Sequence, residues 1–211
     1  MSKPPSPQKK PAFIILGAPG SGKGTQGKIL GRVPRFCHCA CGDVFRSLDT
    51  RTALGQQFVD FSTRGELVPD ELTIELWKAQ IDKLSDTHVY KPDIDFLVLD
   101  GIPRNVRQAE ILCEHIEVHQ VFHLSCPNRN ELARRIRKRA LKENRIDDAS
   151  DKVIDRRIAT YEVETKPIFN FYPAEIVTMI DATQPPVKVL ADIIQRITSL
   201  PVYDEMAKHI A

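Results

Sequence analysis

Short, continuous apolar runs alternate along the chain with longer amphipathic segments. Runs of four to eight apolar residues without polar alternation are typical of strands buried on both faces of a parallel sheet. The segments between them repeat apolar residues at helical spacing, which predicts an α/β fold with an open parallel five-stranded sheet flanked by helices. The expected strands are Ala12–Gly17, Arg35–Cys41 (the weakest), Asp95–Gly101, Gln120–Cys126 and Glu175–Asp181. The expected helices follow Gly17 and occupy Glu71–Leu84, Arg107–His115, Asn130–Leu141, Ser150–Phe171 and Val187–Leu200.

Two stretches interrupt this alternation. Residues 42–84 have a wholly helical pattern, and the stretch around 140–150 is short, polar and charged. Both would lie above the carboxyl ends of the strands, where such sheets bind ligands. At the termini, residues 1–11 are rich in proline and lysine and predict a disordered tail, and residues 201–211 form a C-terminal tail with no predicted element.

Composition narrows the class of protein. The chain has 211 residues, 42% of them hydrophobic, enough for one substantial core. A formal net charge of +2 argues against a dedicated nucleic-acid-binding protein. Five cysteines, an odd number, predict reduced thiols and a cytoplasmic location. No apolar run approaches the length of a membrane span, so no membrane partner is expected.

The stretch GAPGSGKGTQ, residues 17–26, follows the first strand and opens a helix. Its glycines let several backbone N–H groups point inward, and together with the helix N-terminus these favour a phosphate. Lys23 adds a mobile positive charge. A simple glycine-rich turn is the alternative, but the strand before and the helix after supply the context of a phosphate-binding loop. The usual hydroxyl after the lysine is displaced by one residue, because Gly24 precedes Thr25.

Asp100 ends the third strand and begins the stretch DGIPRNVRQ. An acid at this place helps to hold Mg²⁺ in phosphate-binding-loop enzymes, although it could equally cap the next helix. Gly101 and Pro103 predict a tight turn that presents Arg104 to a phosphate. Gln108, one helical turn later, could hydrogen-bond a base, and a plain surface arginine and glutamine remain the alternative.

A basic stripe follows the fourth strand. Arg135, Arg139 and Lys142 share one helical face, Arg145 lies in the polar interruption and Arg157 is on the next helix. The stripe fits a solvated basic face, a nucleic-acid site or an arginine clamp for phosphates. Several aspartates follow it closely, and no aromatic residues are interleaved to stack on bases, which disfavours nucleic acid.

The sequence CHCAC, residues 37–41, invites a metal assignment, but structural zinc sites use wider spacings and a second pair of ligands. Cys113 and Cys126 are isolated from each other and form no such pair. No structural zinc is expected.

Taken in order, these motifs resemble those of nucleoside monophosphate kinases, most closely the adenylate kinase family in its short-lid form. The motifs are GAPGSGKGTQ, GDVFR, GELVPDEL, DGIPRNVRQ and the run from Arg139 through Arg145 to Arg157. In this family glycine after the lysine is normal. The resemblance implies a P-loop NTPase-type fold with one kinase domain at 12–200. Within it the core is 12–41, 85–138 and 149–200, the NMP-binding insertion is 42–84 and the lid is 139–148.

The resemblance also implies a reaction, in which a monomer transfers phosphate from Mg-ATP to AMP and gives two ADP. It assigns catalysis to Lys23, Arg104, Arg139, Arg145 and Arg157, and a water-mediated contact with magnesium to Asp100. ATP would contact Gly20, Ser21, Gly22, Lys23, Gly24, Thr25, Arg135, Arg139 and Gln184. AMP would contact Cys41, Arg46, Glu66, Leu67, Val68, Gly101, Arg104, Gln108, Arg145 and Arg157.

Three departures from the family pattern keep alternatives open. Ala40 and Cys41 replace a Ser-Thr pair, Ile102 replaces a common phenylalanine, and Asn105 is more typical of UMP/CMP kinases. A UMP/CMP kinase is therefore the alternative enzyme. A non-catalytic nucleotide-binding module is an alternative of another class, although every matched arginine is present. A guanine-nucleotide switch would want an NKxD motif, which the chain lacks.

Overall fold

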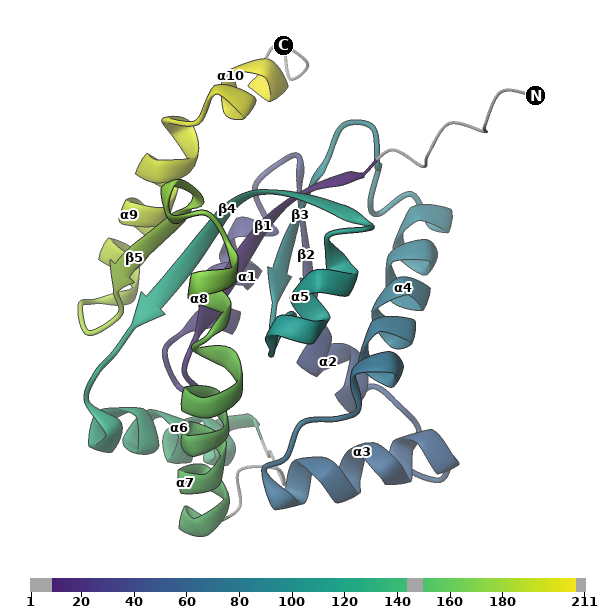
Figure 1. Cartoon of the computed structure of the whole chain (residues 1–211), viewed down its shortest axis with the longest axis vertical. Helices are drawn as coiled ribbons and strands as arrows, with labels where there is room; N and C mark the ends of the chain where they lie inside the picture. The colour runs from purple at the N-terminus through teal and green to yellow at the C-terminus, as the bar shows by residue number, and fades with distance from the viewer. Residues whose placement is uncertain (1–8, 144–149, 208–211) are drawn as a thin grey trace.

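The computed structural model describes residues 9–143 and 150–207 of the chain. Five parallel strands form one sheet, as predicted, and their order is β2-β3-β1-β4-β5 (Figure 1). The phosphate-binding-loop strand β1 is central, and the chain crosses from one side of it to the other between β3 and β4. The strands are β1 (Lys10–Gly17), β2 (Phe36–Ala40), β3 (Phe96–Asp100), β4 (Ile116–Ser125) and β5 (Val177–Asp181).

Strands β1 and β4 begin earlier than the apolar runs that predicted them, which start at Ala12 and Gln120. β1 starts at Lys10, so Lys10 and Pro11 belong to the sheet and not to the expected tail. Lys10 pairs with Ile116 of β4, and its N–H donates to the carbonyl oxygen of His115. The register shifts between Ala12 and Phe13, which separates this polar extension from the apolar part of the strand. Backbone pairing therefore continues where side-chain hydrophobicity gives no signal.

Helices connect the strands and fill the two interruptions. The expected helix at 150–171 is broken into α7, a π-helical turn at Tyr161–Thr165 and α8, with Pro167 directly before α8. A seven-residue helix, α10, lies within the region left without a predicted element. The helices are α1 (Lys23–Leu30), α2 (Cys41–Arg46), α3 (Ala53–Arg64), α4 (Asp70–Asp86), α5 (Val106–Leu112), α6 (Arg129–Glu143), α7 (Asp151–Thr160), α8 (Ile168–Phe171), α9 (Pro186–Thr198) and α10 (Pro201–Ala207).

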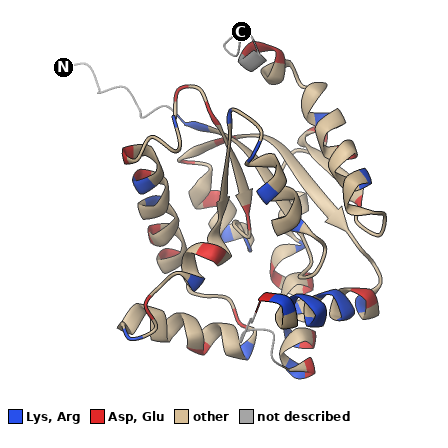
Figure 2. Cartoon of the chain, turned by 180° about the vertical axis from the view of Figure 1, so that it is seen from behind, with Lys and Arg blue, Asp and Glu red and all other residues tan. Residues whose placement is uncertain are grey.

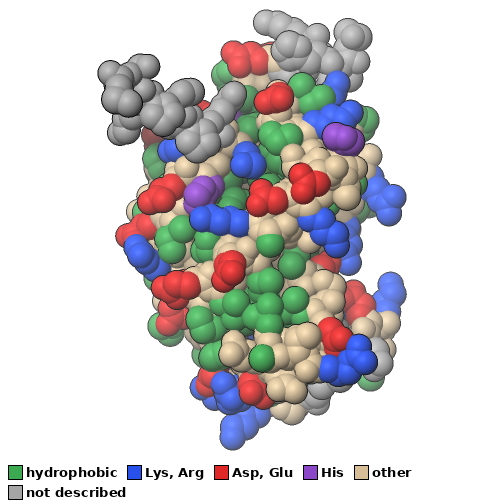
Figure 3. Space-filling model, turned by 90° about the vertical axis from the view of Figure 1, so that its right-hand side faces the viewer, with side chains coloured by type: hydrophobic (Ala, Val, Ile, Leu, Met, Phe, Trp, Pro, Cys, Tyr) green, Lys and Arg blue, Asp and Glu red, His purple; other side chains and the backbone are tan. Residues whose placement is uncertain are grey.

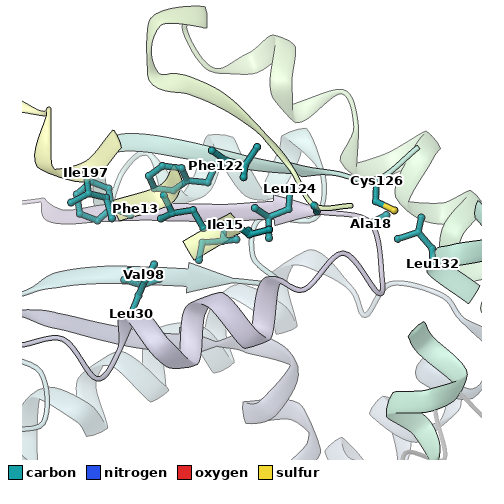
Figure 4. Packing of buried hydrophobic residues seen from close by; sticks show 14 of the residues in the cluster. Phe13, Ile15, Ala18, Leu30, Val98, Phe122, Leu124, Cys126, Leu132 and Ile197 are labelled. Atoms are coloured by element: carbon teal, nitrogen blue, oxygen red, sulfur yellow. The ribbon is translucent and has the colours of Figure 1, made fainter. Parts of the chain in front are cut away.

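The central strands β1 and β3 are buried on both faces, and successive side chains of β1 point to opposite sides of the sheet. Phe13 and Ile15 pack into one hydrophobic cluster, with Leu30 of α1 and Ile197 of α9 (Figure 4). Ile14 and Leu16 pack into the other cluster, which takes its side chains from α4, α5 and α8. These two layers hold the carboxyl ends of the strands rigidly, which is what a site built there requires.

The predicted helical stretch 42–84 contains α2, α3 and α4, which extend from Cys41 to Asp86. Thr52 caps α3 by accepting a hydrogen bond from the N–H of Gly55, and Gly65 ends the helix with φ 70°. Trp77 and Ile81 of α4 are buried against the sheet layer, with 2% of each side chain exposed. On the face that carries α4, hydrophobic side chains gather in the lower half, bordered by charged ones (Figure 3). Among the helices of residues 9–143 and 150–207, none is long and apolar enough to cross a membrane.

Candidate active site

A cavity of about 490 Å³ opens at the carboxyl ends of β1, β2 and β3. This is where the strand order reverses, the usual place for ligands in open α/β sheets. The loop after β1, the loop between α3 and α4, and helices α6 and α7 all contribute walls. Most of the predicted site residues line this cavity: Gly20, Gly22, Lys23, Gly24, Thr25, Arg46, Glu66, Leu67, Val68, Asp100, Gly101, Arg104, Gln108, Arg135, Arg139 and Arg157.

The loop after β1 has the curled backbone that its glycines predict. Gly20 has φ +83° and Gly22 has φ +100°, a left-handed conformation that residues with a side chain rarely adopt. A Cβ atom at Gly20 would also lie 2.8 Å from the carbonyl oxygen of Leu132, so α6 packs directly on the loop. Helix α1 begins at Lys23, and its N-terminus therefore faces the cavity.

The ammonium of Lys23 is held over the loop. Its Nζ donates to the carbonyl oxygens of Gly17 at 2.7 Å and Ala18 at 3.0 Å. Burial lowers the pKa of Lys23 to about 8; Asp100 opposes this shift, and Arg139, Arg104 and Arg157 add to it. Burial is therefore the main cause of the low pKa of Lys23, and the three arginines around the same space lower it further.

Gly24 lies beside the carboxylate of Asp100. A Cβ atom at Gly24 would have Asp100 Oδ2 as its nearest neighbour, at 3.4 Å, which is an ordinary van der Waals distance. The first turn of α1 therefore lies against the carboxylate at the end of β3. Asp100 is 9% exposed, lines the cavity and lies 3.9 Å from His38 Nε2. Thr25 lines the same cavity, so a hydroxyl and a carboxylate share one wall.

The turn after β3 presents Arg104 as predicted. Gly101 has φ +76°, and Arg104 Nε donates to the carbonyl oxygen of Gly101 at 2.8 Å. The hydroxyl of Thr165, in the π-helical turn, donates to the carbonyl oxygen of Arg104 at 2.7 Å. The backbone and side chain of Arg104 are thus both fixed, from two different elements.

Helix α6 carries the basic stripe and is rich in Lys and Arg (Figure 2). Its residues Arg135, Lys138, Arg139 and Lys142 line the cavity. Arg135 is held from both sides, because its Nε donates to Glu131 at 2.7 Å and its Nη1 donates to the carbonyl oxygen of Ala182 at 2.8 Å. Hydrogen bonds from Arg134 and Arg135 hold the pKa of Glu131 down at about 2. The stripe therefore forms a wall of the candidate site. This favours its interpretation as an arginine clamp for phosphates over its interpretation as a solvated basic face.

The loop between α3 and α4 is tied to α7. Glu66 accepts hydrogen bonds from Arg64 and from Arg156 of α7. The hydroxyl of Thr160 donates to the carbonyl oxygen of Gly65 at 3.2 Å. Two segments far apart in the chain thus meet beside Arg157, and both line the cavity.

Three predicted residues of the described part of the chain do not line the cavity. Ser21 is 3% exposed, Cys41 is 2% exposed, and neither lines the cavity, although the neighbours Ala40 and Gly42 do. Gln184 also lies outside the lining, and its amide donates to Asp192 of α9. Its expected contact was through the backbone and stays a prediction. Arg145, with the second half of the expected lid (144–148), falls outside the described residues.

Several lining residues were missed by the sequence reasoning. Thr160, Tyr161 and Thr165 line the cavity, and the four-residue spacing from Arg157 to Tyr161 was a usable signal for one of them. Asp70, which hydrogen-bonds Asn105 and Gln108, carried no signal, because an acid in the first turn of a helix is common. Asn105 itself is the N-cap of α5, accepting from the N–H of Gln108.

Positive charge concentrates in the cavity. Nine lining residues are lysine or arginine and four are aspartate or glutamate, an excess of five against a net +2 for the whole chain. Among residues 9–143 and 150–207, no group of three histidine, cysteine or acidic side chains could hold a metal ion. Its excess of positive charge suits the cavity to polyanions.

A phosphate-binding loop on a central parallel strand, facing a wall of arginines, defines a P-loop protein that transfers or binds nucleotide phosphates. The family model described as adenylate kinase matches residues 15–177. Curated proteins named adenylate kinase are similar to the chain. The one from Cyanothece sp. is 38% identical over 188 residues, which are 86% of this chain and 92% of that protein. The one from Leptospira biflexa is 35% identical over 168 residues, 77% of this chain and 86% of that protein. The chain belongs to the adenylate kinase family of phosphotransferases.

Proposed function

We propose that the chain catalyses the reversible, Mg²⁺-dependent transfer of the γ-phosphoryl group of ATP to AMP, giving two ADP. The observation that carries the proposal is that one cavity joins the phosphate-binding loop to a second group of arginines, Arg46, Arg104 and Arg157. A protein that only bound ATP would need the loop but not a second anion site facing it. The match to the adenylate kinase family supports the same reaction.

The chemistry asks for positioning and charge neutralisation. An oxygen of the AMP phosphate forms a bond to the γ-phosphorus, and the bond from that phosphorus to the β,γ-bridging oxygen breaks, so ADP leaves with the electron pair. The attacking phosphate is largely deprotonated near neutral pH, so no general base is needed. Lys23, Arg104, Arg139, Arg145 and Arg157 would neutralise charge on the group in transfer. The role of Arg145 rests on the family resemblance.

The two substrates would occupy opposite walls. ATP phosphates would lie in the loop from Gly20 to Thr25, with Arg135 and Arg139 reaching from α6. The AMP phosphate would contact Arg46, Arg104 and Arg157. The AMP nucleoside would contact Gln108, Gly101 and the segment Glu66–Val68. Because one chain supplies both walls, we propose that a monomer is sufficient, and its free cysteines suit a cytoplasmic location.

The residues present fit a magnesium ion. Asp100 and Thr25 offer hard oxygen donors in one wall, and Gly24 keeps the space in front of the carboxylate clear of a side chain. A single carboxylate is typical of Mg²⁺ sites in which phosphates and water supply the other ligands. Bound there, Mg²⁺ would neutralise phosphate charge, and Asp100 would hold it directly or through water.

The test is phosphoryl transfer from Mg-ATP to AMP, CMP, UMP and GMP, measured side by side with the purified protein. The proposal expects strong preference for AMP and loss of transfer when EDTA removes Mg²⁺. A UMP/CMP kinase is the second candidate, because the buried thiol of Cys41 stands where the family has a hydroxyl. Preference for CMP or UMP would establish that alternative. ATP binding without transfer to any acceptor would favour a non-catalytic module.

A further inference from the structure

Asp70 joins the insertion to the core through one oxygen atom. Its Oδ1 accepts a hydrogen bond from Asn105 Nδ2 at 2.9 Å and another from Gln108 Nε2 at 2.8 Å. Asp70 is the first residue of α4, whereas Asn105 caps α5 and Gln108 lies in its first turn. The carboxylate therefore connects the N-termini of two helices that come from separate parts of the fold.

These contacts settle which way the Gln108 amide faces. A carboxylate only accepts hydrogen bonds, so the amide group facing Asp70 is the NH₂. At the other end, Gln108 Oε1 accepts from the backbone N–H of Arg104 at 2.8 Å. A flipped amide would set its oxygen against the carboxylate and its NH₂ against an N–H, losing both bonds. Gln108 is 1% exposed and lines the cavity, so its orientation bears on a ligand.

A fixed amide distinguishes nucleobases by their hydrogen-bonding edges. Adenine and cytosine present a ring-nitrogen acceptor beside an amino donor. Guanine and uracil present a ring N–H donor beside a carbonyl acceptor. The second hydrogen of Gln108 Nε2 and the second lone pair of Oε1 match the first pattern, and only a flipped amide would match the second.

We propose that Asp70 is a positioning residue that selects amino-bearing bases in the acceptor pocket by fixing the Gln108 amide. The proposal rests on the proposed function for the identity of the pocket, but it concerns binding and does not require transfer to occur. It predicts preference for AMP over GMP among purines and for CMP over UMP among pyrimidines. It therefore holds for an adenylate kinase and for a kinase that prefers CMP, whereas a preference for UMP over CMP would contradict it.

The experiment measures the binding of AMP, GMP, CMP and UMP to the full chain by calorimetry, without ATP. The wild-type protein is expected to bind AMP about 10- to 100-fold more tightly than GMP, the effect of leaving buried polar groups unpaired. Asp70→Ala is expected to reduce that ratio by about tenfold, mostly through weaker AMP binding, and to leave ATP binding within about twofold.

Asp70→Asn separates orientation from charge. Asn105 Oδ1 is held by the N–H of Gln108, so its Nδ2 still needs an acceptor at position 70. The new amide will present its oxygen there and keep Gln108 in place, so selectivity should stay within about threefold of wild type. Glu71→Ala is the matched control, since Glu71 is an exposed acid in the same helical turn and should change neither ratio.

The outcomes separate this proposal from the proposed function. A wild-type protein that binds AMP and GMP equally, and CMP and UMP equally, overturns the role of Asp70 whatever the transfer assay shows. The role of Asp70 is also overturned if Asp70→Ala leaves the AMP/GMP and CMP/UMP affinity ratios unchanged. It is overturned again if Asp70→Asn reduces these ratios as much as Asp70→Ala does. Selective binding that depends on Asp70, in a protein that transfers no phosphate, supports Asp70 and contradicts only the proposed function.

Discussion

Lys23 is the residue whose surroundings give the site a pH dependence. Its pKa of about 8 lies below the ordinary 10.5, so between these values an unfolded chain binds a proton that the folded chain does not. Through this group, the stability of the ligand-free protein therefore rises with pH across that window. Phosphates act in the opposite direction, because they favour the protonated ammonium.

We therefore expect ATP to raise the pKa of Lys23 and to take up a proton when it binds above pH 8. Calorimetry at pH 9 in two buffers of different ionisation enthalpy measures the uptake, which should approach one proton at pH 9 and zero at pH 7. The Lys23→Met variant is the control and should take up none. Equal uptake in that variant would remove Lys23 as the source.

Gly31 tests a packing requirement at the end of α1. Its φ of −66° is ordinary, yet a Cβ atom there would lie 2.5 Å from the Cβ atom of His38 on β2. Gly31→Ala should lower the free energy of unfolding by about 1–3 kcal/mol, the usual effect of forcing atoms into a packed site. Urea denaturation measures this. Arg32→Ala, an exposed neighbour, should stay within about 0.5 kcal/mol, and equal stability of both variants would contradict the geometry.

At the residue scale, the sequence predicted those site residues whose position depends only on the few residues around them. Lys23 and Arg104 sit in short motifs whose backbone geometry follows from glycine and proline, so their place in the cavity could be predicted. Asp70 could not be, because its role depends on α4 and α5 meeting at their N-termini, a tertiary contact that leaves no local pattern. Cys41 was placed in the site by motif alone, although its side chain is buried behind the wall that its neighbours form.

At the element scale, α7 is joined to the loop between α3 and α4, where we propose that AMP binds. Arg156 pairs with Glu66, and Arg64 pairs with the same carboxylate at 2.9 Å. The Arg156 side chain is 52% exposed, so the pair is worth at most about 1 kcal/mol. Arg156→Ala should therefore raise the KM for the acceptor by no more than about fivefold and leave the KM for ATP nearly unchanged.

Steady-state kinetics with each substrate varied in turn measures this split. Lys152→Ala, an exposed change elsewhere on α7, is the control and should alter neither constant. A double-mutant cycle with Glu66→Gln shows whether the two side chains act as a pair. A larger effect on ATP than on the acceptor would mean that α7 acts through the loop after β1 instead.

The sheet was predictable because each of its strands contains a short, mainly apolar run, so all five were found in the chain. The pattern of apolar residues did not reveal two places where the backbone geometry changes but the spacing of apolar residues does not. Around the π-helical turn at Tyr161–Thr165, apolar residues keep nearly the same helical spacing as in α7 and α8. The sequence therefore predicted one long helix over all three. The polar start of β4 is held by pairing with Lys10 and Pro11, which hydrophobicity does not report.

For the whole molecule, the distribution of charge matters more than its sum. The chain has a net charge of +2, but the residues that line the cavity have an excess of five positive charges. The rest of the chain is therefore slightly acidic. Composition alone could not show this, because the fold gathers α1, α2, α6 and α7 around one space. A positive cavity in such a surface draws anionic nucleotides toward the site.

The positive charge of the cavity should make the association of nucleotides depend on salt. Raising the ionic strength from about 0.1 to 1 M shortens the Debye length from about 10 to about 3 Å, so the association rate constant of a fluorescent Mg-ATP analogue should fall by about tenfold or more. Stopped-flow fluorescence measures the slope against salt. Lys138→Ala, in the cavity wall, should flatten the slope, whereas Lys188→Ala, exposed on α9 and outside the lining, should not. If both variants keep the wild-type slope, the cavity's charge is not what guides the nucleotide, and its excess of cations acts only after binding.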